Sequence, residues 1–436
     1  MSKLIDTARR WLEPNRALLS SGMSLLLSAA ATSGLGFAFW IVAARLFDAD
    51  VVGIASAAVA AMLLLSTLGV IGLDALVITE SGRLLAAGEK REAARGAAAL
   101  VIAAFGFATA LALVSGLLAP RLGGAWLTYF SGFGSVVVFA LGVGLTGAGY
   151  VFDRATIGFL AGGLQLARNV WFSVIKLVAL PALLLLPATI DQPQAIYALW
   201  SGTTLVSLLL VLPKVRALVG AGGLAPRWSA WRRLGSDALK NHLLNVAQHA
   251  PGLLVPVIVA ARFPPATNAA FYVTWMLVTF LQGLPVHLTT ALHAVGMRDG
   301  PELAARLRST LRLGVIVAIA AAAGTAIVAG PLLSMFGQHY SAEAAPALRV
   351  LGLTVLPMMI KLHYFAVARI QGWTARAGAL GVALGAFEVA AVTYGAGSGS
   401  LVTLSWCLFA ALSVEAALLL MPVIKLARLT RSDLSQ

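Results

Sequence analysis

Two basic residues, Arg168 and Lys176, interrupt a long apolar stretch of the sequence. Trp171 and Phe172 lie between them at helical spacing, so a helix would carry basic and aromatic side chains along one face. A guanidinium group pairs with phosphate oxygens, and aromatic rings can cover the apolar faces of a sugar. The stripe therefore predicts a site for a ligand that has both phosphate and sugar parts.

A third basic residue, Lys361, lies in another apolar stretch, and three acids occur in or at the ends of such stretches as well: Asp74, Glu388 and Glu415. Two interpretations of Lys361 remain open. Either it binds the same anionic ligand, or it pairs with Glu388 or Glu415 and joins helices, because a buried charge needs a partner in either case. The acids and His363 are candidates for taking up an ion or a proton, and a hydrogen-bonded core position is the alternative for His363.

The composition indicates what surrounds these charges. Of the 436 residues, 60% are hydrophobic and only 11% are charged, whereas soluble domains carry about a quarter charged residues. The apolar residues form runs of about 20, the length at which a helix crosses the hydrocarbon core of a bilayer. Lipid offers no hydrogen bonds to the backbone, and the alternating segments of a membrane barrel are absent. The sequence therefore predicts an all-α polytopic membrane protein.

Apolar runs between turn and charge signals give twelve predicted spans in two sets of six. The first set is 19–44, 51–73, 97–119, 129–150, 156–187 and 194–213. The second set is 242–261, 268–292, 313–334, 345–368, 376–396 and 401–424.

Lysine and arginine residues fall mainly in alternate loops, and 24 of the 31 lie on one side of the predicted membrane. The positive-inside rule places that side, together with both termini, in the cytoplasm. Topology thus explains most of the net charge of +14, and we expect no nucleic-acid partner.

The predicted organisation has five parts: an interfacial amphipathic helix (1–18), an N-lobe (19–213), a cytoplasmic linker (214–240), a C-lobe (241–426) and a cytoplasmic tail (427–436). Trp228 and Arg227 in the linker are typical of a segment anchored at the membrane interface. Recognition of an anionic lipid by the same residues is the alternative.

Sequence matches between the two sets of spans predict an internal repeat. A shift of 217 residues takes Arg45, in "IVAAR", to Arg262 in a second "IVAAR", and a shift of 214 aligns 150–158 with 364–372. Because six is an even number, both halves enter the membrane in the same direction. We therefore expect two six-helix lobes related by a pseudo-two-fold axis along the membrane normal.

Glycine and proline residues at matching places in the first and seventh spans predict hinges. Gly34 and Gly36 lie in the first span, Pro251 lies in the seventh, and Pro357 adds a bend to the second lobe. Helices broken at corresponding positions of two repeats commonly mark a ligand site in membrane proteins. Packing is the alternative, because both residue types are common in membrane helices.

Signatures of several enzyme classes are absent, since the sequence contains no P-loop, no GxSxG and no HExxH. His287 and His293 are six residues apart, which places them on different faces of a helix rather than around a metal. The single cysteine, Cys407, has no disulfide partner. We expect neither an enzyme nor a metal or cofactor site.

Five stretches carry a family resemblance: "GFAFWIVAARLFDADVVGIASA" (36–57), "GLDALVITESGRL" (72–84), "FDRATIGFLAGGLQLARNVWFSVIKL" (152–177), "NHLLNVAQHAPGLLVPVIVAARFPPATNAAFYVTWM" (241–276) and "GPLLSMFGQHYSAEAAPALRVLGLTVLPM" (330–358). They look like bacterial polysaccharide exporters, the oligosaccharide-lipid flippase branch of the multidrug/oligosaccharidyl-lipid/polysaccharide (MOP) exporter superfamily. One departure follows "GLD", where relatives often have an arginine and a proline-containing turn, whereas this chain has Glu80.

The resemblance implies two lobes around a cationic central cavity and alternating access that carries a lipid-linked sugar outward. It implies substrate-binding positions in the fifth and seventh spans: Arg168, Asn169, Lys176, Asn241, Asn245 and His249. We therefore expect a flippase for a lipid-linked oligosaccharide or a related glycolipid, with Lys361 joining Arg168 and Lys176 in attracting the phosphate.

The expected location is a bacterial plasma (inner) membrane, with membrane lipids and the glycosyltransferases or polymerase of a polysaccharide pathway as partners. One alternative is a drug or organic-cation exporter of the same superfamily, although a positive cavity opposes cationic cargo. The others are a membrane glycosyltransferase or polymer ligase and a non-transporting scaffold.

Overall fold

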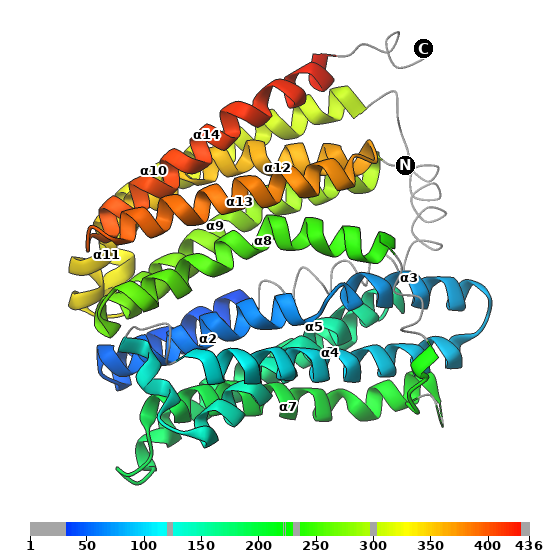
Figure 1. Ribbon diagram of the computed structural model, residues 1–436, viewed down its shortest axis with the longest axis horizontal. Helices are drawn as coiled ribbons and strands as arrows, with labels where there is room; N and C mark the ends of the chain where they lie inside the picture. Colours follow the sequence, from blue (N-terminus) through cyan, green and yellow to red (C-terminus); the bar gives the residue numbers. More distant parts are fainter. Residues whose placement is uncertain are drawn as a thin grey trace, which may run out of the picture. The chain divides into compact units, whose positions relative to one another are not determined.

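Every regular element in the described part of the chain is helical. The computed structural model describes residues 32–119, 125–220, 222, 224–229, 236–296 and 303–428, so the predicted helix at 1–18 and most of the predicted tail lie outside it. The first helix is Thr32–Leu46. The elements that follow it (Figure 1) are α2 (Ala49–Gly69), α3 (Leu73–Ala86), α4 (Lys90–Leu118), η2 (Ala125–Phe130), α5 (Phe133–Gly158), α6 (Gly162–Ala179), η3 (Leu180–Leu185), α7 (Gln192–Val219), α8 (Ser236–Arg262), α9 (Pro265–Gly296), α10 (Leu303–Ser334), α11 (Gln338–Leu353), α12 (Val355–Ile370), α13 (Thr374–Ala396) and α14 (Leu401–Arg428).

Nine of the described helical segments are long and apolar enough to cross a membrane. The pair α11 and α12, bent by 42°, makes a tenth candidate if it is one span. The remaining two predicted spans coincide with the helix Thr32–Leu46 and with α9. Helices of this length satisfy their own backbone hydrogen bonds in lipid, and the prediction of an all-α polytopic membrane protein is confirmed.

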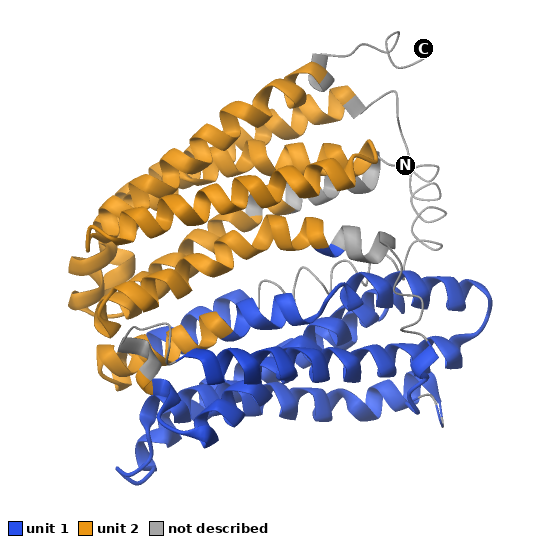
Figure 2. Cartoon of the chain, in the orientation of Figure 1, with its two compact units in different colours: residues 1–43, 62–122, 129–242 blue, residues 44–61, 123–128, 243–436 orange. Residues whose placement is uncertain are grey.

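The chain forms two compact units, each described by itself (Figure 2). Unit 1 comprises Met1–Ala43, Met62–Leu122 and Tyr129–His242. Unit 2 comprises Ala44–Ala61, Gly123–Thr128 and Leu243–Gln436. The first half of α2 therefore belongs to unit 2 and its second half to unit 1.

Small residues allow the helices of unit 1 to approach closely. A Cβ added at Gly69 of α2 would lie 2.6 Å from the Cα of Ala108 in α4, and Gly144 of α5 faces Thr109 of α4 with no room for a side chain. Lipid gives packed helices no hydrophobic driving force, so close backbone contact of this kind stabilises their association.

Polar contacts join the end of the helix Thr32–Leu46 and the start of α2 to the rest of unit 2. Arg45 donates to the carbonyl oxygens of Ser334 at 3.1 Å and Met335 at 3.0 Å, at the end of α10. Asn268 of α9 donates to the carbonyl oxygen of Gly53 in α2 at 2.8 Å. The last carbonyl groups of a helix have no partner within it, so Arg45 stabilises the end of α10.

The predicted repeat has counterparts in the helix boundaries. The helices that contain the two "IVAAR" copies end at Leu46 and Arg262, and after two residues the next helices begin at Ala49 and Pro265. Later in each half, an offset of 212 residues takes Leu160 to Gly372, both with positive φ, and the start of α6 to the start of α13. The offset predicted for this region was 214, which is two residues too large. Apolar residues can be matched at several neighbouring offsets, whereas a residue with positive φ marks one position in the chain.

Two breaks interrupt the predicted spans, at places that are not equivalent in the repeat. Between α2 and α3, Ile71 (φ 49°) and Gly72 (φ 79°) lie in the left-handed region, where a β-branched residue is strained. In unit 2 the chain turns at Thr354 between α11 and α12, and Pro357 lies in the first turn of α12.

The breaks predicted at Gly34, Gly36 and Pro251 are wrong. The helix Thr32–Leu46 runs through both glycines, and α8 runs through Pro251. The proline ring lies against α13, where a Cβ added at Gly385 would be 2.6 Å from its Cγ. A proline within a helix removes one backbone hydrogen bond, and packing against neighbouring helices offsets that loss. Pro357 is the predicted hinge residue that lies at a break, and its motion stays a prediction.

Candidate functional site

Lys176 of α6 lies in a cage of three aromatic rings within unit 1. Its ammonium nitrogen is 3.5 Å from the ring centroid of Trp200 in α7, 4.1 Å from that of Phe172 and 5.3 Å from that of Phe39. The residue is 1% exposed, and no carboxylate in the described ranges pairs with it. Cation–π attraction grows when a site is desolvated, so the rings hold the ammonium group but leave its charge uncompensated.

Arg168, about two turns earlier on the same helix, is paired inside unit 1. Its guanidinium donates to both carboxylate oxygens of Asp153 in α5, at 2.8 and 2.6 Å, and to the amide oxygen of Asn169. This is the bidentate geometry that makes arginine–carboxylate pairs strong. Of the two cations of α6 that were predicted to bind phosphate, Arg168 pairs with a carboxylate of the protein and Lys176 does not.

Sequence reasoning misses several of these partners. The predicted fourth span ends at 150, whereas α5 continues to Gly158 and keeps Asp153 within the helix. Trp171 was expected on the basic stripe but is 46% exposed and takes no part in the cage. Phe39 and Trp200 come from other helices, and the only sequence signal for them is their aromatic type within an apolar run.

Lys361 of α12 lies between two glutamates within unit 2. Its ammonium group donates to Glu388 of α13 and lies 2.8 Å from Oε2 of Glu415 in α14. All three residues are buried. Of the two interpretations left open by the sequence, the structure places Lys361 in an ion pair with both acids. One ammonium group faces two carboxylates, so the cluster has an excess of negative charge when all three groups are ionised.

A second polar group in unit 2 surrounds Arg369 of α12. Its guanidinium donates to the side-chain oxygens of Asn245 and Gln248 in α8, each at 2.8 Å. Asn245, expected to bind substrate, is therefore oriented by an arginine that the sequence assigned to a loop. His249 is exposed on α8, and the side chain of Asn241 lies outside the described residues.

The remaining candidates for ion uptake, His363 and Asp74, take no part in the ion pairs of Lys361. His363 is buried, with Nδ1 2.8 Å from the carbonyl oxygen of Met359 and Nε2 3.2 Å from the hydroxyl of Thr310, which is the arrangement of a hydrogen-bonded core histidine. Asp74 lies in the first turn of α3, and its buried Oδ1 accepts no hydrogen bond from the described residues. The described part of the chain contains no group of three or more ligating side chains that could hold a metal ion.

Comparison of the sequence with protein-family models and with curated proteins finds no match. Solved structures match over almost the whole chain. One is an inward-facing multidrug resistance MATE family transporter of the MOP superfamily, with a TM-score of 0.69 and 12% identity, covering 92% of this chain and 98% of that chain. An outward-facing conformation of such a transporter has a TM-score of 0.60 and 14% identity, covering 96% and 97%. The chain has the MATE-like transporter fold.

Another structure with the MATE-like fold is a MOP superfamily transporter from Pyrococcus furiosus, for which reverse polarity of the binding pocket suggests a different function. It matches with a TM-score of 0.62 and 14% identity, covering 97% of each chain. At these identities the likeness establishes the fold, and the more specific resemblance to polysaccharide flippases stays a prediction. The apolar helices and the MATE-like fold together identify the chain as a multi-pass membrane protein.

Proposed function

We propose that the chain is a membrane exporter that moves a lipid-linked oligosaccharide or a related glycolipid to the outer leaflet by alternating access. The observation that carries the proposal is Lys176, a buried cation among aromatic rings with no carboxylate paired to it in the described ranges. The phosphate of a lipid-linked sugar would supply the missing anion, and rings such as that of Trp200 would cover the sugar. The N–H groups of Arg168 that do not bond to Asp153 would also donate to this phosphate.

The MATE-like fold and the sequence resemblance to bacterial polysaccharide exporters support this proposal. The distribution of lysine and arginine favours cytoplasmic termini in a bacterial inner membrane. In that setting, the glycosyltransferases that build the lipid-linked sugar, or the polymerase that uses it, would be the partners of this chain.

The sequence has no P-loop for ATP, and an ion gradient is the energy source that we propose for transport. We propose the cluster of Lys361, Glu388 and Glu415 as the place of ion coupling. Uptake of one proton or one monovalent cation would neutralise its excess negative charge. A buried cluster of this kind responds strongly to one added charge because little solvent screens it.

The proposal is tested by labelling the outer leaflet of intact cells with an impermeant sugar-specific probe. Deletion of the gene should trap the lipid-linked sugar in the inner leaflet and lower the labelling. The wild-type gene should restore it, Lys176→Met should not, and Lys425→Met, at an exposed lysine of α14, should restore it at equal membrane levels. Unchanged labelling in a deletion strain that has no other flippase would contradict the proposal.

A drug or organic-cation exporter is the second candidate. The excess negative charge at Glu388 and Glu415 favours it, as does the likeness to multidrug resistance MATE transporters. If this candidate is correct, deletion should sensitise cells to cationic dyes, and Glu415→Gln should fail to restore resistance while Lys176→Met restores it. The two candidates thus predict opposite results for the lysine variant.

A non-transporting scaffold is separated from the glycolipid exporter by charge reversal at Lys176. Lys176→Glu changes only a buried side chain, so a scaffold would still recruit sugar enzymes through its cytoplasmic loops. An exporter of an anionic glycolipid should lose outer-leaflet labelling in this variant. If the chain were instead a membrane glycosyltransferase, deletion of the gene should abolish synthesis of the sugar itself.

A further inference from the structure

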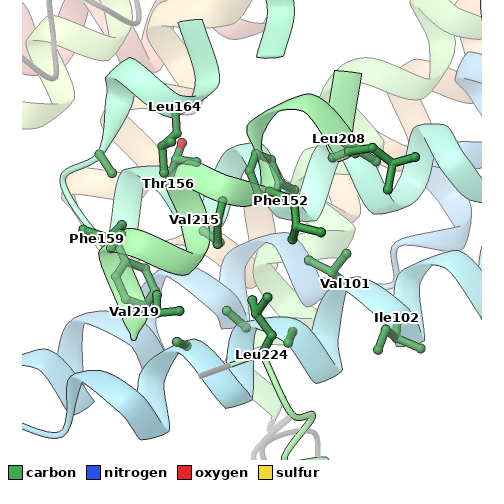
Figure 3. Close-up of a pocket in the computed structure, with 18 residues that line it drawn as sticks. Val101, Ile102, Phe152, Thr156, Phe159, Leu164, Leu208, Val215, Val219 and Leu224 are labelled. Carbon is green, nitrogen blue, oxygen red and sulfur yellow. The ribbon is translucent and has the colours of Figure 1, made fainter. Parts of the chain in front are cut away.

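Unit 1 contains an apolar cavity of about 280 Å³ among the ends of four helices (Figure 3). The first part of α4 and the last part of α7 line it, together with the end of α5 and the start of α6. Of its 18 lining residues only Thr156 is polar, and its hydroxyl already donates to the carbonyl oxygen of Asp153 at 2.7 Å. A buried water needs two to four polar partners, so the cavity suits hydrocarbon and not water.

The cavity reaches surface that a membrane-spanning helix presents to lipid. Ile102 of α4 and Leu209 of α7 both line it, and they are 46% and 55% exposed. Large apolar side chains that are exposed within long apolar helices face the hydrocarbon of the bilayer. An acyl chain can therefore enter from the membrane without crossing a polar surface.

Basic residues surround the end of the cavity that lies at the start of α4 and the end of α7. Arg91 lies three residues before the lining residue Ala94, on the same face of α4. On α7, Lys214 and Arg216 stand on either side of the lining residue Val215. All three cations are exposed, and in the described segments no carboxylate pairs with Arg91.

Hydrogen bonds fix the segment after α7 over this basic end. The backbone N–H of Arg227 donates to the carbonyl oxygen of Arg95 at 2.9 Å, and its guanidinium donates to Glu92 at 2.7 Å. Arg95 in turn donates to the carbonyl oxygen of Ala225 at 3.2 Å and pairs with the same Glu92 at 3.1 Å. These bonds hold Leu224, which lines the cavity, beside α4. Two of the four arginines on this end, Arg95 and Arg227, share the single carboxylate of Glu92, so positive charge is left over.

We propose that this cavity binds an acidic phospholipid of the surrounding bilayer, with an acyl chain inside it and the phosphate at Arg91 and Arg227. Charge complementarity selects this occupant. The guanidinium fork matches phosphate oxygens, and an acidic phospholipid brings a phosphate without a compensating cation. A zwitterionic headgroup adds no net negative charge, so it would leave the basic end uncompensated. The bound lipid would join α4 to the segment at 224–229. This site lies apart from the Lys176 cage, and its occupancy does not depend on which cargo the chain exports.

Native mass spectrometry of the full-length protein in detergent tests the proposal. The protein is titrated with dioleoylphosphatidylglycerol and, separately, with dioleoylphosphatidylcholine. We expect one phosphatidylglycerol to be retained about fivefold more strongly than phosphatidylcholine, or more. Ala98→Trp fills the cavity and should lower this retention about fivefold, and Arg91→Gln should bring it down to that of phosphatidylcholine.

Matched controls lie in unit 2: Ala320→Trp on an exposed face of α10 and Arg376→Gln at the exposed start of α13 should retain phosphatidylglycerol as the wild type does. Equal retention of the two lipids by the wild type overturns the proposal, and so does full retention by a monodisperse Ala98→Trp protein. Arg91 is exposed at a helix start, so Arg91→Gln leaves the packing intact and decides the matter if Ala98→Trp does not fold.

Discussion

The two units bury a lysine in opposite surroundings. In unit 1, Lys176 is surrounded by aromatic rings, and the ion pair between Arg168 and Asp153, about two turns earlier on α6, is balanced. In unit 2, Lys361 is surrounded by two glutamates. One positive charge is therefore left over in the first cluster and one negative charge in the second, when every group is ionised.

The contrast is sharpest at one position of the repeat. The offset of 212 residues that relates α6 to α13 takes Lys176 to Glu388, and each is the fifteenth residue of its helix. The fifth span of each half thus has one buried ionisable side chain at the same position, and the charge of that side chain is positive in the first half and negative in the second. This difference fits the proposed division of tasks, in which the basic half binds the anionic substrate and the acidic half takes up the coupling cation.

Lys361→Met should have the largest effect on stability. It leaves two buried carboxylates without their cation, and removal of one partner from a buried ion pair costs about 3–5 kcal/mol. We expect a clear fall in the midpoint of thermal unfolding in detergent, and recovery of most of it when Glu388→Gln and Glu415→Gln are added. Lys425→Met, at an exposed site, should unfold as the wild type does. If Lys361→Met is as stable as the wild type, the two glutamates do not depend on Lys361 for compensation, and the two units do not differ in their buried charge.

Asp153→Asn should have the next largest effect, because it leaves Arg168 without a carboxylate. The two side chains are 9% and 15% exposed, so the expected loss of about 2 kcal/mol lies between that of an exposed pair and that of a fully buried one. The control is Glu80→Gln: Glu80 is 11% exposed but its partner Arg83 is 48% exposed, so solvent screens the pair and the loss should stay below about 1 kcal/mol. A loss as small as in the control would mean that other groups compensate Arg168, and the charge balance of unit 1 would then not depend on the pair with Asp153.

The turn after the fourth span of each half gives a smaller contrast. Gly372 and Leu160 occupy equivalent turns with positive φ, and glycine alone adopts that conformation without strain. Gly372→Leu should cost about 1 kcal/mol. Leu160→Gly should stabilise the protein by about 0.5 kcal/mol, because relief of strain is partly offset by a more flexible unfolded chain. Chemical or thermal unfolding measures both, and a loss of stability in both variants would show that the two turns are not equivalent.

The sequence was sufficient for the fold class, because a bilayer allows few structures to span it and each must be long and apolar. The helical spacing also predicted that Arg168, Phe172 and Lys176 share one face of α6, whereas Trp171, placed on the same stripe, is exposed. The partners of these residues were not predictable in the same way, since Phe39, Asp153 and Trp200 come from other helices. The contacts between side chains of different helices depend on how the helices pack, and the residue spacing within one helix does not predict that packing.

The positions of the helix breaks were also not predictable from the local sequence. Pro251 was expected to break its span, yet Gly385 on the neighbouring helix makes room for its ring and α8 continues. The break between α2 and α3 contains no proline at all, and its strained residue, Ile71, carries no local signal. Tertiary packing overrides local preference at both places.

Lys176→Met should have the smallest effect on stability and still abolish the proposed transport. Methionine loses the cation–π attraction to Trp200 and Phe172, but it also removes the cost of burying a charge that no carboxylate compensates. We therefore expect no loss in the unfolding midpoint, in contrast to Lys361→Met, together with outer-leaflet labelling as low as in the deletion strain. A fall in stability comparable to that of Lys361→Met would mean that Lys176 is held by an acid after all. Full labelling with unchanged stability would show that Lys176 does not bind the substrate. The opposite charges of the two units would then have a role in packing and none in transport.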